Sequence, residues 1–178
     1  MSFLHSGIKS AHTINTLWII RHGEAEERSR DGEDISRELK GSARLDWAIM
    51  KRWLISMPTG PEWVFSSPAL RTLQTAELIS TYFNSELIVD NNLYLATADT
   101  LIDRIRSTPE DIYDLALVAH NPGVSILASS LAQMNAPMFV PTWGIAHCQF
   151  ESPWHTLSEH TNTKVSLATP KLIKTKTD

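Results

Sequence analysis

The chain has 178 residues, of which 42% are hydrophobic and 20% charged, with a formal net charge of −4. This length suits one domain with a substantial core, and the composition is ordinary for a soluble globular protein. The modest negative charge argues against a nucleic-acid-binding surface, which needs clustered Lys and Arg. A single cysteine, Cys148, excludes an intrachain disulfide. No apolar run approaches the ~18 residues of a membrane span, and residues 1–16 contain no apolar segment of signal-peptide length. We therefore expect a cytoplasmic protein.

Apolar runs and amphipathic segments alternate along the chain after a polar leader at residues 1–15. The patterns predict strands at 17–20, 62–65, 86–89, 114–119, 144–150 and 164–167, the last two at or toward a sheet edge. They predict helices at 42–57, 69–83, 99–106 and 122–134. This alternation is typical of a mostly parallel sheet with helices on both faces, formed by one domain at 16–170. The charged stretch 24–38 is expected as a surface loop or short helix beside the site, and 171–178 as a frayed tail.

The first motif, Arg21-His22-Gly23, directly follows the apolar run Leu17-Trp18-Ile19-Ile20. Such a run ending in polar, glycine-containing sequence indicates a buried strand that opens into a loop. In open α/β sheets, ligands bind at this end of the strands. The residue types suit phosphoryl chemistry, because arginine binds the anion, histidine accepts the phosphoryl group, and glycine allows close approach. A tripeptide alone is nevertheless a weak signal.

Two later motifs strengthen this interpretation. The segment 66–76, which contains Arg71, follows the apolar run 63–65. The segment His120-Asn121-Pro122-Gly123 follows the apolar run 115–119. Three predicted strands thus each deliver an arginine or a histidine at the carboxyl end, in the order Arg-His, Arg, His.

With these motifs, the chain resembles the histidine phosphatase superfamily and, within it, the small SixA branch of phosphohistidine phosphatases. The likeness runs from about Thr16 to Lys174. It implies an α/β three-layer sandwich of the phosphoglycerate mutase-like kind, with a mostly parallel sheet and no large cap. It also implies an enzyme that uses no cofactor and no metal ion.

The resemblance also implies a role for each motif residue. His22 is the expected nucleophile, attacking as a neutral imidazole through one ring nitrogen while the other donates its proton to a backbone carbonyl. Arg21 and Arg71 would clamp phosphate oxygens through bidentate bonds. His120 and Asn121 would complete the phosphate pocket, which should also accept a phosphate or sulfate anion.

One departure from the family pattern concerns the proton donor. Many members place a glutamate after the strand that follows the second motif, where this chain has Asn92. Asparagine cannot donate a labile proton, so Glu24 and Asp99 are the candidate donors. An imidazole leaving from a P–N bond needs an acid less than an alkoxide does. The substitution therefore favours phosphohistidine over unactivated sugar phosphates.

Structural roles compete with these functional ones. Arg21 would pair with Glu24 or Glu26 in a purely structural loop, and Arg71 with a carboxylate such as Glu77. Arg37 either meets the substrate or is a solvated charge. Of the six tryptophans, only Trp143 is placed to line the pocket.

The favoured function is removal of phosphate from phosphohistidine on a histidine-containing phosphotransfer domain of a two-component relay, by a monomer that contacts neither nucleic acid nor membrane. A small open site would admit a side chain on a folded protein. Two alternatives remain: a general phosphomonoesterase acting on small phosphate esters, and a catalytically idle module that only binds phosphate.

Overall fold

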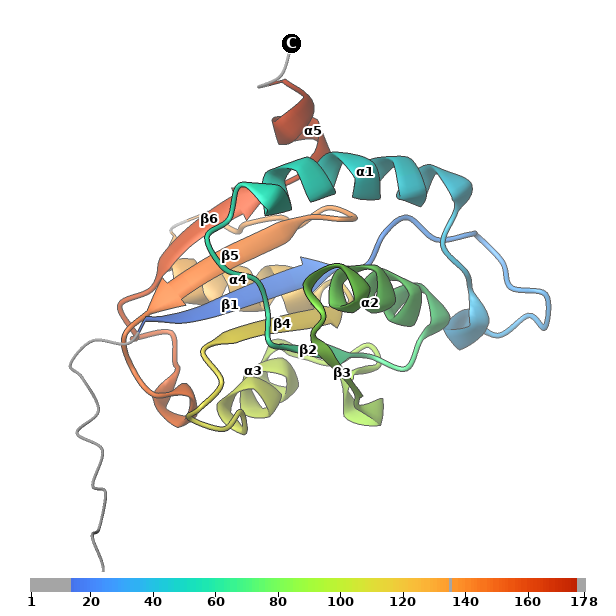
Figure 1. The fold of residues 1–178 in the computed structure, drawn as a ribbon. Helices are drawn as coiled ribbons and strands as arrows, with labels where there is room; N and C mark the ends of the chain where they lie inside the picture. The colour runs from blue at the N-terminus through green and yellow to red at the C-terminus, as the bar shows by residue number, and fades with distance from the viewer. Residues whose placement is uncertain (1–13, 135, 176–178) are drawn as a thin grey trace, which may run out of the picture.

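The computed structural model describes residues 14–134 and 136–175, which form a sheet between two layers of helices (Figure 1). The strands are β1 (Asn15–Arg21), β2 (Trp63–Ser66), β3 (Glu86–Val89), β4 (Asp114–Ala119), β5 (Ile145–Phe150) and β6 (Lys164–Ala168). The helices are α1 (Gly41–Ile55), α2 (Leu70–Phe83), α3 (Ala98–Arg106), α4 (Gly123–Ala132) and α5 (Pro170–Lys174). Short 3-10 turns form η1 (Asp34–Ser36), η2 (Asn91–Leu93) and η3 (Trp154–Thr156).

The sheet has the strand order β3-β2-β4-β1-β5-β6. The pairs β3–β2, β2–β4 and β4–β1 are parallel, whereas β5 is antiparallel to both of its neighbours. The predicted α/β sandwich with a mostly parallel sheet is confirmed. The two late strands also lie where expected, because β6 forms one edge of the sheet and β5 lies next to it.

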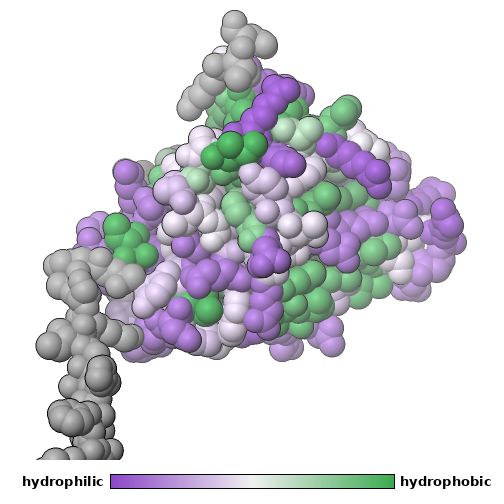
Figure 2. All heavy atoms as spheres, in the orientation of Figure 1, coloured by the Kyte–Doolittle hydropathy of each residue, from purple (hydrophilic) through white to green (hydrophobic). Residues whose placement is uncertain are grey.

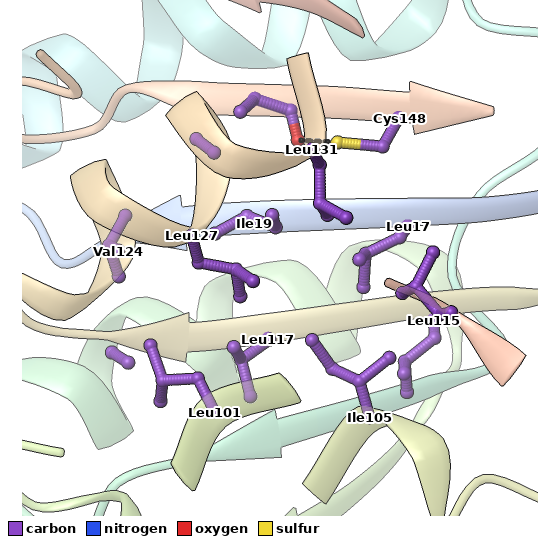
Figure 3. Packing of buried hydrophobic residues seen from close by; sticks show 14 of the residues in the cluster. Leu17, Ile19, Leu101, Ile105, Leu115, Leu117, Val124, Leu127, Leu131 and Cys148 are labelled. Carbon is purple, nitrogen blue, oxygen red and sulfur yellow. Dashed lines mark hydrogen bonds between the residues drawn. The ribbon is translucent and has the colours of Figure 1, made fainter. Parts of the chain in front are cut away.

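Alternate residues of the central strands fill two separate cores, one on each face of the sheet. Leu17 and Ile19 point toward α3 and α4, where they pack with leucine, isoleucine and valine side chains (Figure 3). Trp18 and Ile20 point the other way and pack in the core formed with α1 and α2. Burial on both faces explains why β1 is a continuous apolar run instead of an alternating one.

The ends of the described chain differ in part from the sequence prediction. The strand β1 begins at Asn15, one residue inside the predicted leader, and residues 1–13 lie outside the described residues. Residues 171–174, expected as a frayed tail, belong to α5, which packs against α1. Thr169 caps this helix by accepting a hydrogen bond from the Leu172 main-chain N–H at 3.2 Å. No helix in the described part is long and apolar enough to cross a membrane.

The register of the three central parallel strands brings their carboxyl ends to one level. Arg21 of β1 pairs with Ala119 of β4, and Ser66 of β2 pairs with Val118. Hydrogen bonding continues one residue further, since the His22 N–H donates to Ala119 O at 3.3 Å and the Ser67 N–H to Val118 O at 3.2 Å. The residues that follow these strands must therefore emerge side by side.

Gly123, the first residue of α4, lies directly against the segment that precedes α3. A Cβ atom at this position would collide with the main-chain oxygen of Ala96. Because that contact is with backbone, no side-chain rotation can relieve it.

We predict that Gly123→Ala lowers the free energy of unfolding by about 1–3 kcal/mol, because the added methyl group forces the backbone at Ala96 to move. Urea denaturation measures this change. Gly41→Ala is the matched control: Gly41 also begins a helix but has open space around its missing Cβ, so this variant should be neutral or slightly stabilising. Equal effects of the two substitutions would contradict the steric explanation.

Candidate active site

The four residues predicted for catalysis come together at the carboxyl edge of the sheet. Arg21 ends β1 and His22 follows it, Arg71 lies in the first turn of α2 after β2, and His120 follows β4. The rings of His22 and His120 are 5.3 Å apart between centroids, and Arg71 Nη2 lies 3.4 Å from His120 Nδ1. Arg71 and His120 are each only 3% exposed. The strand register thus assembles the three sequence motifs into one site.

One ring nitrogen of His22 is fixed by the backbone. Its Nδ1 lies 2.7 Å from Gly23 O, and because a carbonyl oxygen can only accept, Nδ1 carries the proton. Burial lowers the pKa of His22 to about 4; the hydrogen bond to Gly23 opposes this shift, and the charges of Arg71 and Arg21 reinforce it. The imidazole is therefore neutral at physiological pH, with its lone pair on Nε2.

His120 is also held as a neutral ring. Burial lowers its pKa to about 3, with further lowering by His22 and Arg71. Its Nε2 lies 2.7 Å from Ser67 Oγ, and its Nδ1 faces the Arg71 guanidinium, which can only donate. This arrangement puts the proton of His120 on Nε2, where it is donated to Ser67.

The carbonyl oxygen of Val140 holds Arg21 and Asn121 beside each other. Arg21 Nη1 donates to this oxygen at 3.4 Å, and Asn121 Nδ2 donates to it at 3.0 Å. The Asn121 side-chain oxygen accepts from the Ser125 N–H and hydroxyl group. The Nε atom of Arg21 is buried without a hydrogen-bond partner among the described residues, which leaves a donor ready for an anion.

Arg71 is held by a residue that the sequence motifs do not include. Its Nη1 donates to the main-chain oxygen of Asp34 at 2.7 Å, and its Nη2 donates to Asp34 Oδ2 at 2.9 Å. The same carboxylate accepts from Tyr94 Oη at 2.7 Å and, through Oδ1, from Arg37 Nη1 at 2.8 Å. Three donors therefore meet on Asp34, and two of the five Arg71 N–H groups are engaged there.

This network keeps Asp34 ionised. Hydrogen bonds from Arg37, Tyr94 and Arg71 hold the pKa of the Asp34 carboxyl well below its usual range. Asp34 lies in η1, within the predicted charged loop that follows β1, and Figure 2 shows hydrophilic residues gathered over this end of the molecule. No local pattern in the sequence singles out Asp34, because two of its three partners, Arg71 and Tyr94, are 37 and 60 residues away.

The other predicted residues have varied surroundings. The Glu24 carboxylate accepts from Lys40 Nζ at 2.8 Å and from Ser42 Oγ at 3.1 Å, and these bonds lower its pKa. Asp99 is exposed in the first turn of α3, and Asn92 is exposed in η2. Two residues after Asn92, Tyr94 reaches the site, with its ring 5.7 Å from that of His120.

The structural contacts considered from the sequence for Arg71 and Arg37 differ from those that the structure shows. Arg71 does pair with a carboxylate, but that carboxylate is Asp34 and not Glu77. Arg37, for which substrate contact and solvation were both open, donates to Asp34 and to Glu26 O. Among the described residues, no three His, Cys, Asp or Glu side chains gather as a metal ion would require.

Trp143 packs beneath the nucleophile loop and is fully buried, so it does not line an open pocket as predicted. Its main-chain N–H donates to His22 O at 3.3 Å, its indole stacks on Trp47 with ring centroids 5.3 Å apart, and a Cβ on Gly23 would overlap the indole. Gly23 is therefore required for close packing, and its N–H donates to Thr75 Oγ1 of α2 at 3.0 Å.

Residues 17–94 match the family model of the histidine phosphatase superfamily, branch 1. This range contains Arg21, His22 and Arg71 but not His120. A search of curated proteins finds no match.

Solved structures with similar folds extend the likeness beyond this range. A protein assigned as phosphohistidine phosphatase SixA from Nakamurella multipartitia is 18% identical, with a TM-score of 0.76, covering 90% of this chain and 99% of its own. The protein histidine phosphatase SixA in complex with tungstate is 24% identical, with a TM-score of 0.73, covering 89% and 99%. A mycobacterial glucosyl-3-phosphoglycerate phosphatase is 14% identical, with a TM-score of 0.63, covering 88% and 99%. Together, the family model and the shared phosphoglycerate mutase-like fold confirm that this chain resembles the histidine phosphatase superfamily, with SixA proteins among its structural neighbours.

Proposed function

We propose that the protein is a phosphatase that acts through a covalent phosphohistidine intermediate on His22. The observation that carries the proposal is the state of His22: a neutral imidazole whose Nδ1 proton is committed to Gly23 O, leaving Nε2 as a nucleophile. Around it stand two arginines and a second histidine, which supply the N–H donors and positive charge that a phosphoryl group needs.

In the first step, His22 Nε2 attacks phosphorus and the bond from phosphorus to the leaving group breaks. Arg21 and Arg71 bind the equatorial oxygens, Arg71 through the N–H groups that Asp34 leaves free. As the substrate binds, the charge on those oxygens raises the pKa of His120, which takes a proton from solvent on Nδ1 and becomes a donor, and this proton returns to solvent when orthophosphate leaves. Water then attacks the phosphohistidine, orthophosphate leaves, and neutral His22 returns.

The charge state of the nearby carboxylates favours phosphohistidine as substrate. Both Asp34 and Glu24 are held in the ionised form, so neither is suited to protonating a leaving group. An imidazole leaves readily from a P–N bond, whereas an alkoxide leaves poorly without an acid. Asp99 stays a candidate donor only if α3 approaches the bound substrate.

The neighbouring structures support both this substrate and an alternative. One SixA neighbour is assigned as a phosphohistidine phosphatase, and another, named a protein histidine phosphatase, was solved with tungstate, an oxyanion like the phosphate expected here. The glucosyl-3-phosphoglycerate phosphatase shares the fold and acts on a small ester. The second candidate function is therefore a small-molecule phosphomonoesterase that uses the same residues.

We predict that the protein rapidly releases phosphate from a histidine-phosphorylated phosphotransfer domain and that His22→Ala abolishes this release, because no other nucleophile lies at that position. A time course of phosphate release, run beside p-nitrophenyl phosphate, measures both reactions. His155→Ala, which changes an exposed histidine of η3, is the control and should retain full activity. Turnover of the ester alone would select the phosphomonoesterase, and binding without turnover of either compound would select an idle phosphate-binding module.

A second prediction concerns the protonation of the two histidines. NMR titration of the ring carbons should give a midpoint near pH 4 for His22, well below the usual value of about 6.5, because burial disfavours the cation. The imidazole is protonated only below that midpoint, so it stays neutral from pH 5 upward. Added tungstate should raise the midpoint of His120. A midpoint near 6.5 for His22 in the free protein would contradict the proposed resting state.

A third prediction tests the charge of Asp34. Asp34→Asn keeps oxygen acceptors for Arg71 but removes the anion that competes with phosphate, so the affinity for tungstate should rise about tenfold. Titration calorimetry measures it. Asp31→Asn makes the same charge change in the same loop, where Asp31 accepts from the Glu33 N–H, and should leave the affinity within about twofold. Unchanged binding by Asp34→Asn would show that the carboxylate does not oppose the anion.

A further inference from the structure

Three exposed large apolar residues are next in sequence to residues that hold the arginines of the site. Ile35, Leu95 and Phe139 are 38%, 56% and 67% exposed. Ile35 follows Asp34, Leu95 follows Tyr94, and Phe139 precedes Val140, so each adjoins a residue of the networks that hold Arg71 or Arg21. The Phe139 ring also lies over the Arg21 guanidinium, 5.7 Å from its carbon. These three residues are called the apolar collar.

The backbone at Leu95 makes this exposure unusual. Leu95 has a φ of +49°, in the left-handed region that favours glycine and asparagine over residues with bulky side chains. A leucine there costs folding free energy, and its exposed side chain recovers little of that cost by burial. Backbone strain of this kind concentrates at functional sites.

We propose that the apolar collar is the docking surface for a folded protein substrate, whose phosphorylated side chain enters the pocket while an apolar patch around that side chain packs on Ile35, Leu95 and Phe139. This inference rests on the proposed function and names the part of the substrate that lies outside the pocket.

The arrangement of charge and apolar surface fits this occupant. Arg71 is buried in the site, whereas the three apolar side chains are exposed, next in sequence to residues that hold Arg71 or Arg21. A free phosphate or a small phosphorylated compound is bound entirely by the central groups and gains little from the collar. Only a ligand that is anionic at its centre and apolar around it matches both, as does a phosphorylated residue on an apolar protein face.

The approach to the collar is open. Among the described residues, the connections 22–40, 90–97 and 133–144 on this side of the sheet contain the 3-10 turns η1 and η2 and no α-helix. A folded partner could therefore approach the strand ends without displacing a helical cover. Exposed apolar groups are ordinary when scattered, whereas three of them around one charged pocket are typical of a protein interface.

The test compares two substrates that share a P–N bond and differ in size: phosphoimidazole and a histidine-phosphorylated phosphotransfer domain. Leu95→Asn and Ile35→Ser should each lower kcat/KM for the protein substrate about tenfold and leave kcat/KM for phosphoimidazole within about twofold. Phe139 is left unchanged, because its ring contacts Arg21. Leu45→Ser and Ile55→Ser replace equally exposed apolar residues of α1, 70% and 65% exposed, and should change neither value.

The Leu95→Asn variant separates docking from folding. Asparagine accepts the left-handed backbone, so this variant should unfold about 2 °C higher than the wild type while turning over the protein substrate more slowly. A loss of activity cannot then be ascribed to a weakened fold.

Three outcomes would overturn the proposal: unchanged turnover of the protein substrate by both collar variants, an equal loss with both substrates, or an equal loss in the α1 controls. Failure of the proposed function gives a different result, since the wild type would then hydrolyse neither P–N compound. If the wild type hydrolyses phosphoimidazole but not the phosphorylated domain, the collar has no protein to dock and the proposal also fails.

Discussion

The in-register pairing of three parallel strands is the constraint on which the site depends. Because β1 lies beside β4 and β4 beside β2, the residues after these strands leave the sheet at one level. Residues from positions 21, 71 and 120 thereby meet, although nearly a hundred residues separate the first from the last. A shift of one residue in β1 would send His22 to the opposite face and exchange the two cores. The apolar packing of β1, through Leu17, Trp18, Ile19 and Ile20, thus also fixes the direction in which His22 points.

Burial then sets the chemical state of the groups that the register assembles. The two histidines lose water and so remain neutral, whereas the carboxylate of Asp34 is partly exposed and stabilised by three donors. The site thus keeps the two histidines uncharged through burial and keeps Asp34 charged through hydrogen bonds. The site therefore contains a nucleophile and two cations but no carboxylic acid that is held protonated. For this reason the proposed substrate is one whose leaving group, an imidazole, departs readily without an acid.

The sequence predicts the strand ends well and their surroundings poorly. Apolar runs of strand length mark β1, β2 and β4, so the positions of Arg21, His22, Arg71 and His120 follow from local patterns. Asp34 and Tyr94 could not be predicted, since neither lies at a strand end and their meeting depends on how two loops fold over α2. The burial of Trp143 under Gly23 depends on a left-handed turn at Trp143 itself, which its residue type disfavours. The short helix α5 is invisible to periodicity because five residues are too few to show one.

The carboxylate of Asp34 ties the arginine clamp to the acid stability of the whole protein. Its pKa in the folded state lies below the value of about 3.8 expected for an unfolded chain, so its ionisation stabilises the native state above that pH, and the contribution is lost as the pH falls through the folded value. Acid therefore weakens a hydrogen-bond network that joins the loop after β1 to α2 and to the segment after η2. In an acidic medium the active site loses stability for a second reason, because the lowered pKa values of His22 and His120 mean that protonation of these rings also favours the unfolded chain.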